Sequence, residues 1–526
     1  MVDGATHKKE GYLDVRISFG LQGKVHNVHL LAIPTGHSAH TGENYAEFVL
    51  NVLKDIDNDE GVLLKQLIGI STDGAATMLG RHQGFSTRVR AAAESQGNPS
   101  ITINWCGSHQ LNLAVDAFLK VLDCKVKFRK RLGSDISFTR RYETVRFSVG
   151  LCPSYATTRW ESIYDACHFL AKHYGQLVAA QAAKTYTKSS NEWRLCLFVV
   201  SEISEWIRCC FRKLQIKTVT MREQYVALDE LVHTLQLKYE SDSDDGDVHI
   251  DSSKVAHHLQ WCSFSSMSLF EGMHADNSPH ESAQVRTSEQ EQNSEAPGLY
   301  TEEFFMPDNE NEQYENEFEE DAWCTEVEQD MTEDVNQNLS WNELVQTFAE
   351  AVTVFIKSVS HIRLDIHKDV REEPPTRPID VVRCSDKTYR ALLVAQTAKL
   401  EARFGFTATQ DIWNQRKCLI QCYTKKGDCR RKIKENEYAP LQQGWDEVAA
   451  FGNFEMVCNF TIGLASIAPG THTVEGDFST LKRVMGLHRG RLSNYAMEGE
   501  LQARQYFQLM SLANEVGSDE AHEALE

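Results

Sequence analysis

The sequence of 526 residues lacks long apolar runs, and none reaches the roughly 18 consecutive residues that would span a bilayer. The residues after Met1 contain no apolar stretch typical of a signal peptide, so we expect none. The 14 cysteines are scattered, which favours reduced thiols in the cytosol or nucleus over a disulfide framework. The 41% hydrophobic content is typical of a globular protein. We therefore expect a folded protein with no membrane partner.

Basic residues are nearly absent from one segment, between Glu240 and Asp334. It contains about 27 acidic residues but only Lys254 and Arg286 as cations, and it accounts for the net charge of −21. The rest of the chain is close to +4, with about 48 acidic and 52 basic residues. So polar a segment cannot offset its ordering entropy through burial, which predicts disorder over 240–335. It is either a solvated linker or an acidic arm that competes with DNA for a basic surface.

An α/β pattern precedes residue 125, and helical periodicity dominates after residue 160. The expected early elements are strands at Tyr12–Phe19 and Lys24–Ile33, a helix at Asn44–Ile56 with Thr41 or Glu43–Asn44 as cap, strands at Leu67–Ser71 and Ile101–Trp105, and a helix at Leu111–Leu122. The expected later helices are Glu161–Ala179, Trp193–Leu214, Trp341–Ile366, Asp386–Phe404, Asp411–Cys422, Gly476–Leu487 and Tyr495–Ala513.

Three carboxylates stand where an apolar or β-branched run gives way to a loop. They are Asp3, Asp73 and Glu475. Carboxylates gathered at strand ends are how many enzymes hold two divalent ions for phosphodiester chemistry. Because Glu475 comes hundreds of residues after Asp73, the pattern predicts a large insertion from which the chain returns to the first domain. Taken singly, Asp3-Gly4 and Asp73-Gly74 are equally consistent with turns, and Glu475 with an acid at a helix N-terminus.

Two basic stretches offer possible phosphate contacts. The first contains Lys125, Lys127, Arg129, Lys130 and Arg131, and is followed by Arg140-Arg141. It fits either a surface that tracks a nucleic-acid backbone, a nuclear address, or an ordinary solvated face. The second, Lys425-Lys426 with Arg430–Lys432, is less specific.

Five motifs, in this order and rough spacing, resemble the hAT superfamily of DNA transposases. They are Val2-Asp3-Gly4-Ala5-Thr6, Thr72-Asp73-Gly74-Ala75-Ala76-Thr77-Met78, Cys106-Gly-Ser-His109-Gln-Leu-Asn-Leu113, Thr158-Arg159-Trp160 and Val474-Glu475-Gly476-Asp477-Phe478-Ser479-Thr480-Leu481-Lys482-Arg483. The last is similar to the C-terminal box of that family, with Gly476 where an Arg is usual. The resemblance covers most of the chain.

The resemblance implies a role for each matched residue. Asp3, Asp73 and Glu475 would be the catalytic triad and would hold two Mg²⁺ or Mn²⁺ ions, one activating a water or 3′-hydroxyl and the other stabilising the leaving oxygen. His109 would contact phosphate, and so would Arg159. Trp160 would stack on a nucleobase swung out of the helix. As an alternative, Trp160 is a plain core aromatic. Cys106-x-x-His109 is half a zinc site without a second pair at suitable spacing, so we expect no zinc.

The resemblance also implies an architecture: an α/β ribonuclease H-like catalytic core interrupted by a large, mainly α-helical insertion domain, with a C-terminal helical dimerisation segment. The expected segments are 1–124 (first part of the core, its first strand truncated), 125–239 and 336–460 (insertion domain), 240–335 (acidic and disordered) and 461–526 (return to the core and dimerisation region). Phe478, Leu481 and Leu501 would serve dimerisation. The helical spacing of Phe478 and Leu481 equally fits core positions.

Family members usually carry an N-terminal BED-type zinc finger, for which there is no room before Asp3. We therefore expect a decayed or truncated copy, a gene-model fragment or a domesticated derivative, and we expect that the chain does not transpose DNA by itself. The first hypothesis is a transposase-derived protein whose ancestral chemistry is metal-dependent DNA cleavage and strand transfer; the alternative is an inactive scaffold for dimerisation and nucleic-acid binding. A third is an unrelated helical scaffold with a coincidental triad. The expected partners are DNA and a second copy, with no small-molecule substrate, and the expected location is nuclear, or else cytosolic.

Overall fold

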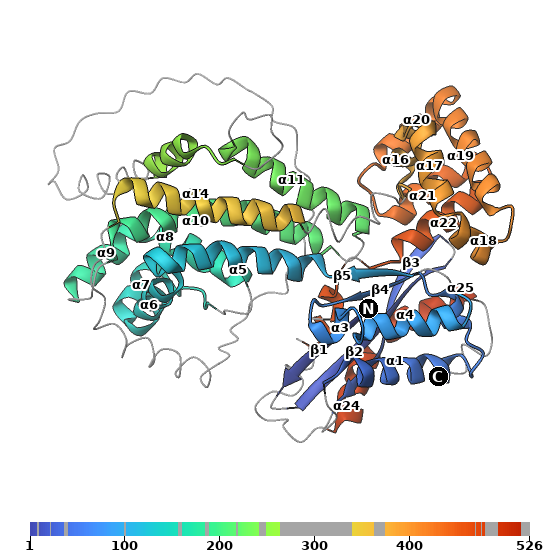
Figure 1. Ribbon diagram of the computed structural model, residues 1–526, viewed down its shortest axis with the longest axis horizontal. Helices are drawn as coiled ribbons and strands as arrows, with labels where there is room; N and C mark the ends of the chain where they lie inside the picture. Colours follow the sequence, from blue (N-terminus) through green and yellow to red (C-terminus); the bar gives the residue numbers. More distant parts are fainter. Residues whose placement is uncertain are drawn as a thin grey trace, which may run out of the picture. The chain divides into compact units, whose positions relative to one another are not determined.

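The computed structural model describes residues 1–7, 10–21, 23–35, 40–98, 101–155, 160–184, 189–216, 219–240, 249–262, 339–361, 374–468, 470–474, 476–478 and 493–516. The chain divides into two compact units, which we describe separately (Figure 1). The first unit comprises Met1–Phe118, Glu205–Asp251 and Glu350–Glu526, and the second comprises Leu119–Ser204 and Ser252–Ala349.

An antiparallel meander opens the first unit. Strands β1 (Val2–His7), β2 (Glu10–Leu21) and β3 (Lys24–Pro34) pair in the order β1-β2-β3. The turn between β2 and β3 includes Gly23, whose φ of 80° lies in the left-handed region that glycine adopts without strain. The register shifts between Val15 and Arg16, which marks an irregularity in β2.

A short parallel pair follows. Strand β4 (Gly69–Thr72) pairs with β5 (Thr102–Trp105), and β1 lies beside β4. Four helices occupy the connections: α1 (Gly42–Ile56), α2 (Val62–Gln66), α3 (Ala76–Leu79) and α4 (Phe85–Ser95). Apolar residues of β1, β2, β4, α1 and α4 form one core, which includes Val2, Leu13, Val15, Tyr45, Ile70 and Phe85. The predicted helix at 44–56 is confirmed, with the Thr41 side chain as its N-cap.

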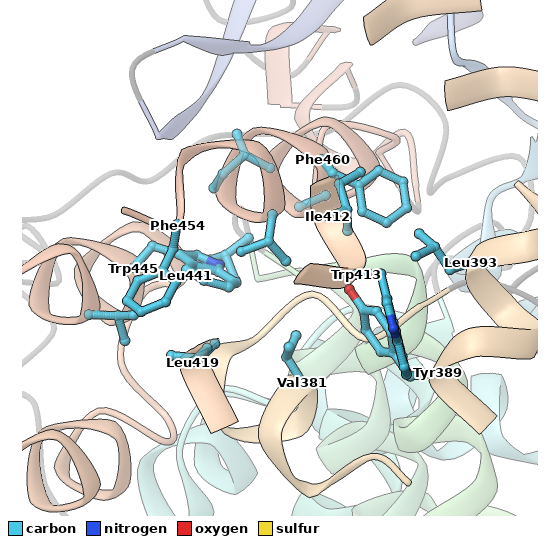
Figure 2. Packing of buried hydrophobic residues seen from close by; sticks show 14 of the residues in the cluster. Val381, Tyr389, Leu393, Ile412, Trp413, Leu419, Leu441, Trp445, Phe454 and Phe460 are labelled. Carbon is cyan, nitrogen blue, oxygen red and sulfur yellow. The ribbon is translucent and has the colours of Figure 1, made fainter. Parts of the chain in front are cut away.

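A helical cluster late in the chain forms the second core of this unit. Its helices are α16 (Pro378–Arg383), α17 (Asp386–Ala395), α18 (Thr397–Phe404), α19 (Ala408–Lys425), α20 (Gly427–Glu435), α21 (Leu441–Ala449) and α22 (Glu455–Ala465). Figure 2 shows its interior, where Tyr389 lies beside Trp413, and Trp445 beside Leu441 and Phe454. Helix α22 packs against β2 and β3.

Two C-terminal helices cover the edge strand β3. They are α24 (Asn494–Arg504) and α25 (Tyr506–Val516). The Gln505 side chain accepts from the His29 N–H at 2.9 Å and donates to the His29 carbonyl at 2.7 Å. Gln502 donates to the Leu30 carbonyl and Glu498 accepts from the Ala32 N–H. These side chains satisfy backbone groups that an edge strand otherwise leaves open to pairing with another chain.

The remaining helices vary in length, from 7 residues in α7 to 24 residues in α10. They are α5 (Gly107–Val126), α6 (Phe128–Arg141), α7 (Glu143–Val149), α8 (Trp160–Lys172), α9 (Tyr174–Ala183), α10 (Asn191–Leu214), α11 (Met221–Tyr239) and α14 (Trp341–His361). Residues 252–262 are also helical, although they fall inside the segment 240–335 predicted to be disordered. There the prediction fails because Val255, Leu259 and Cys262 form a buried apolar stripe at helical spacing. Residues 241–248 and 263–338 of that segment lie outside the described residues.

Candidate functional site

The first predicted carboxylate, Asp3, lies on β1 directly opposite Asp14 of β2. Opposed residues of an antiparallel pair project to the same face of the sheet. Asp3 is buried and accepts a hydrogen bond from the Gly4 N–H at 2.8 Å. The neighbours of Asp14 in β2, Leu13 and Val15, belong to the apolar core on the other face. Asp3 and Asp14 therefore lie on the face of the sheet opposite to Leu13 and Val15, which we call the polar face.

Charged residues meet on this polar face around His29 of β3. Its Nδ1 lies 3.2 Å from Asp14 Oδ1 and 3.5 Å from Asp477 Oδ2, and its Nε2 lies 3.1 Å from Glu498 Oε1. Burial disfavours the charged imidazole, but hydrogen bonds with Asp14, Asp477 and Glu498 together raise the pKa of His29 to about 11. Arg16 forms an ion pair with Asp477. We call these five residues the His29 cluster.

The pKa values of the carboxyl groups in the His29 cluster diverge. Burial raises the pKa of Asp14 to about 6, although the hydrogen bond to His29 opposes this. Burial also disfavours the charged form of Asp477, but hydrogen bonds and charge from His29 and Arg16 hold its pKa below the ordinary value. Asp14, His29 and Asp477 have the donor atoms of a metal site. Because protonated His29 and Arg16 already supply positive charge, we interpret the cluster as an ion-pair network.

The second predicted carboxylate, Asp73, immediately follows β4, where the sequence placed it. Its Oδ1 accepts from the Ala75 N–H at 3.2 Å, and its charge acts together with burial to raise the pKa of Tyr45. A Cβ at the next residue, Gly74, would meet the Trp105 ring at 2.2 Å, so this turn needs glycine. The Tyr45 hydroxyl also lies 3.9 Å from a Cβ built on Gly4. Tyr45 thus lies close to Gly4 and within the electrostatic reach of Asp73.

The Cys106–His109 motif spans the start of α5, beside the returning chain. The Thr471 N–H donates to Cys106 Sγ at 3.4 Å. Burial raises the pKa of the Cys106 thiol, but hydrogen bonds and charge from His109, with help from the Thr471 N–H, bring it below the ordinary value. Within the described parts of the chain, no group of three metal-ligand side chains includes Cys106 or His109.

The chain segment around residue 470 returns to the sheet. The Ala468 carbonyl accepts from Ser71 of β4 and, at 3.3 Å, from Asn104 of β5. Val474 and Phe478 pack with Tyr12 of β2, and Asp477 joins the His29 cluster on the same polar face. Glu475, the third predicted carboxylate, lies outside the described residues.

The predicted nucleic-acid contacts differ in their surroundings, because some of the cations are paired with carboxylates and others are exposed. Arg129 pairs with Asp123, and Arg131 lies 3.1 Å from Asp135, so two cations of the basic stretch are engaged within their own unit. Lys125 is exposed, as is Lys127, and Lys130 is half-buried. Arg159 lies outside the described residues. Trp160 is the first residue of α8, and its side chain is not among those described.

Two of the predicted dimerisation residues belong to the chain's own core. Phe478 and Leu501 pack with Tyr12, Val474 and Met497. The core interpretation of Phe478 is therefore confirmed, and Leu481 lies outside the described residues. Sequence reasoning missed the exposed aromatics of the C-terminal helices, since Tyr495 and Phe507 are 89% and 83% exposed. It also missed Asp14, His29 and Glu498, whose only sequence signal is the presence of charged residues in β-rich or amphipathic runs.

No protein-family model and no curated protein matches this chain. In the regions that the structure describes, no helix is long and apolar enough to cross a membrane.

Proposed function

We propose that the chain is a hAT-like, transposase-derived protein with a ribonuclease H-like core. The observation that carries the proposal is the course of the polypeptide: β1 with Asp3 lies beside β4, and Asp73 directly follows β4. Late in the chain, Ala468 returns to β4 and β5, and Val474 and Phe478 return to Tyr12 of β2. Three carboxylates spread from residue 3 to residue 475 can form one site only if the chain returns in this way. A coincidental set of carboxylates would not require the return. The order of a three-stranded antiparallel meander followed by a two-stranded parallel sheet supports this proposal.

Asp3, Asp73 and Glu475 would carry the ancestral chemistry, metal-dependent DNA cleavage and strand transfer. Asp3 and Asp73 supply carboxylate oxygens, the ligands preferred by Mg²⁺ and Mn²⁺. Such ions would activate the attacking oxygen and stabilise the leaving one. The buried Asp3 side chain is held by a hydrogen bond from the Gly4 N–H, and a metal ligand must be fixed in this way. His109 and the exposed Lys125 and Lys127 would neutralise phosphate charge.

An inactive scaffold is the second candidate function, and the exposed aromatics of α24 and α25 favour it. Tyr495 and Phe507 are suited to an interface because aromatic residues are enriched at the buried centres of protein contacts. In this alternative the protein keeps dimerisation and nucleic-acid binding in the nucleus after losing its chemistry.

The deciding experiment is Mn²⁺-dependent nicking of a hairpin or branched DNA by the purified chain. Asp3→Asn, Asp73→Asn and Glu475→Gln are compared with Glu94→Gln, which changes an exposed acid on α4. Nicking by the parent and Glu94→Gln but by none of the three triad variants supports the enzyme. A folded parent that binds DNA without nicking it supports the scaffold, and nicking that survives all three substitutions sinks the triad.

A further inference from the structure

A mixed cluster of metal-binding side chains lies within the second unit, whereas the residues of the proposed triad belong to the first unit. Glu202 comes from α10, and His258 and Cys262 come from the helix at 252–262. One ligand atom from each lies within 4.8 Å of the other two. His258 and Cys262 are each 3% exposed, whereas the Glu202 side chain is 29% exposed.

The spacing of the two helical residues is suited to chelation. His258 and Cys262 are four residues apart, so they lie on one face of the helix, one turn apart. Glu202 completes the group from the facing helix, with its Oε2 2.7 Å from His258 Nε2. The hydrogen bond places the imidazole nitrogen and the carboxylate oxygen next to each other, and one ligand atom of each of the three residues lies within 4.8 Å of the other two.

The donor set selects the kind of ion. Imidazole nitrogen and thiolate sulfur suit Zn²⁺ and are poor ligands for Mg²⁺ or Ca²⁺. With bonds of about 2.0–2.3 Å, ligand atoms of a tetrahedral zinc site stand about 3.3–3.8 Å apart. The Nε2–Oε2 pair at 2.7 Å would therefore open by about 1 Å or less, which a rotation of the Glu202 side chain provides.

We propose that Glu202, His258 and Cys262 form a Zn²⁺ site that ties α10 to the helix at 252–262. Three protein ligands leave a fourth position, which the half-exposed side of Glu202 opens to water. Binding releases the Cys262 thiol proton to solvent, because the thiolate is the form that ligates the metal. The site is independent of the proposed Mg²⁺ or Mn²⁺ triad, and its role is to hold two helices together.

Co²⁺ titration of the purified full chain, stripped of metal with a chelator, tests the site. The parent should bind one equivalent with the visible bands of a tetrahedral site and a thiolate-to-cobalt charge-transfer band, and Zn²⁺ should displace both. Cys262→Ser should abolish the charge-transfer band, and Glu202→Gln should weaken Zn²⁺ binding at least about tenfold while leaving a polar side chain beside His258.

Matched controls come from neighbouring residues. His257→Gln alters an exposed histidine next to His258, and Cys209→Ser alters an exposed cysteine on α10. Both should bind like the parent, whereas His258→Gln should not. A thiolate band absent from the parent, or retained in Cys262→Ser, overturns the proposal. Circular dichroism of each variant without metal distinguishes the loss of a metal ligand from the loss of the fold. If His258→Gln does not fold, the Zn²⁺ affinity of Glu202→Gln tests the proposal instead.

Discussion

Asp3 and Asp14 occupy directly opposed positions on β1 and β2, and both side chains are buried on the same face of the sheet. Asp14 is tied to His29, and through it to Asp477 and Glu498 of the returning chain. The His29 cluster therefore joins the strand next to Asp3 to the C-terminal part of the protein. The contacts within the His29 cluster therefore determine the surroundings of Asp3, the first carboxylate of the proposed triad.

The first prediction concerns the alkaline stability that His29 confers. The pKa of His29 is raised from 6.5 to about 11 in the folded chain. The stabilisation by protonated His29 is complete below pH 6.5 and is lost as the pH rises towards 11. Between these two values the folded state binds a proton at His29 that the unfolded state has released, so a rising pH favours unfolding. The free energy of unfolding should fall across this range by on the order of 1 kcal/mol per pH unit from His29 alone.

Urea unfolding of the parent and His29→Gln at several pH values measures this effect. Tyrosines and cysteines of the unfolded chain lose their protons in the same range, so the informative quantity is the difference in the free energy of unfolding between the two proteins. That difference should shrink steadily as the pH rises above 6.5. A difference that does not depend on pH would show that His29 is not held as a cation.

Local signals predicted much of the first 125 residues. The β-rich runs became β2 and β3, the apolar run before Asp73 became β4, and Thr41 caps α1 as expected. These features depend on residues close in sequence, such as alternation and capping. The short apolar run at Leu67–Ser71 predicted a buried parallel strand, and β4 does pair in parallel with β5.

Features that depend on distant residues could not be read from the sequence. The predicted helix at 495–513 is broken at Gln505 in the structure, where the side chain bonds both backbone groups of His29. Helical periodicity continues across Gln505, so nothing local marks the break. The His29 cluster likewise joins residues hundreds of positions apart, and each of its members alone resembles an ordinary charged residue.

The second prediction concerns Arg416, which is fully buried in the late helical core. Its guanidinium donates to the Val381 and Cys384 carbonyls and lies over the rings of Tyr389 and Trp413. Arg416→Ala should cost about 3 kcal/mol, since it leaves buried carbonyls without a donor and a cavity between two rings. Arg416→Lys should recover only part of the lost stability, because the lysine ammonium cannot stack on an aromatic ring or donate the guanidinium's set of hydrogen bonds.

Thermal or urea unfolding measures these differences, and stability should decrease in the order parent, Arg416→Lys, Arg416→Ala. Arg431→Ala is the matched control, since Arg431 is 61% exposed and pairs with Asp428 on the surface. It should change stability by no more than about 0.5 kcal/mol. Equal effects at the two positions would refute the assigned role of Arg416.

The third prediction uses a close approach at Gly42, the first residue of α1. A Cβ there would meet backbone atoms of Gln83, Phe85 and Thr77 at 2.5–2.6 Å. Backbone atoms cannot rotate away, so Gly42→Ala should destabilise by about 1–3 kcal/mol. Gly427→Ala, at the start of α20, has nothing within 4 Å of the new methyl group and should be neutral or slightly stabilising. Stability that is unchanged in Gly42→Ala would contradict the packing of α1 against α3 and α4.

The last prediction concerns self-association. If α24 and α25 form the dimer surface, the contacts must come from exposed residues, because Phe478 and Leu501 are used inside the chain. Tyr495→Ser and Phe507→Ser should each weaken dimerisation by about tenfold or more, the effect of removing a central aromatic anchor. Leu501→Ala should instead lower stability by about 2–5 kcal/mol.

Sedimentation equilibrium over a range of concentrations gives the dimer constants. Phe147→Ser is the control, because Phe147 is 84% exposed but lies on α7 in the second unit. A parent that stays monomeric, or a loss of dimer with Phe147→Ser alone, would show that the C-terminal helices do not form the interface. A dimer constant that is sensitive to Tyr495 and Phe507 but not to Phe147 would locate the interface on α24 and α25, because all three residues expose aromatic surface and only their location differs.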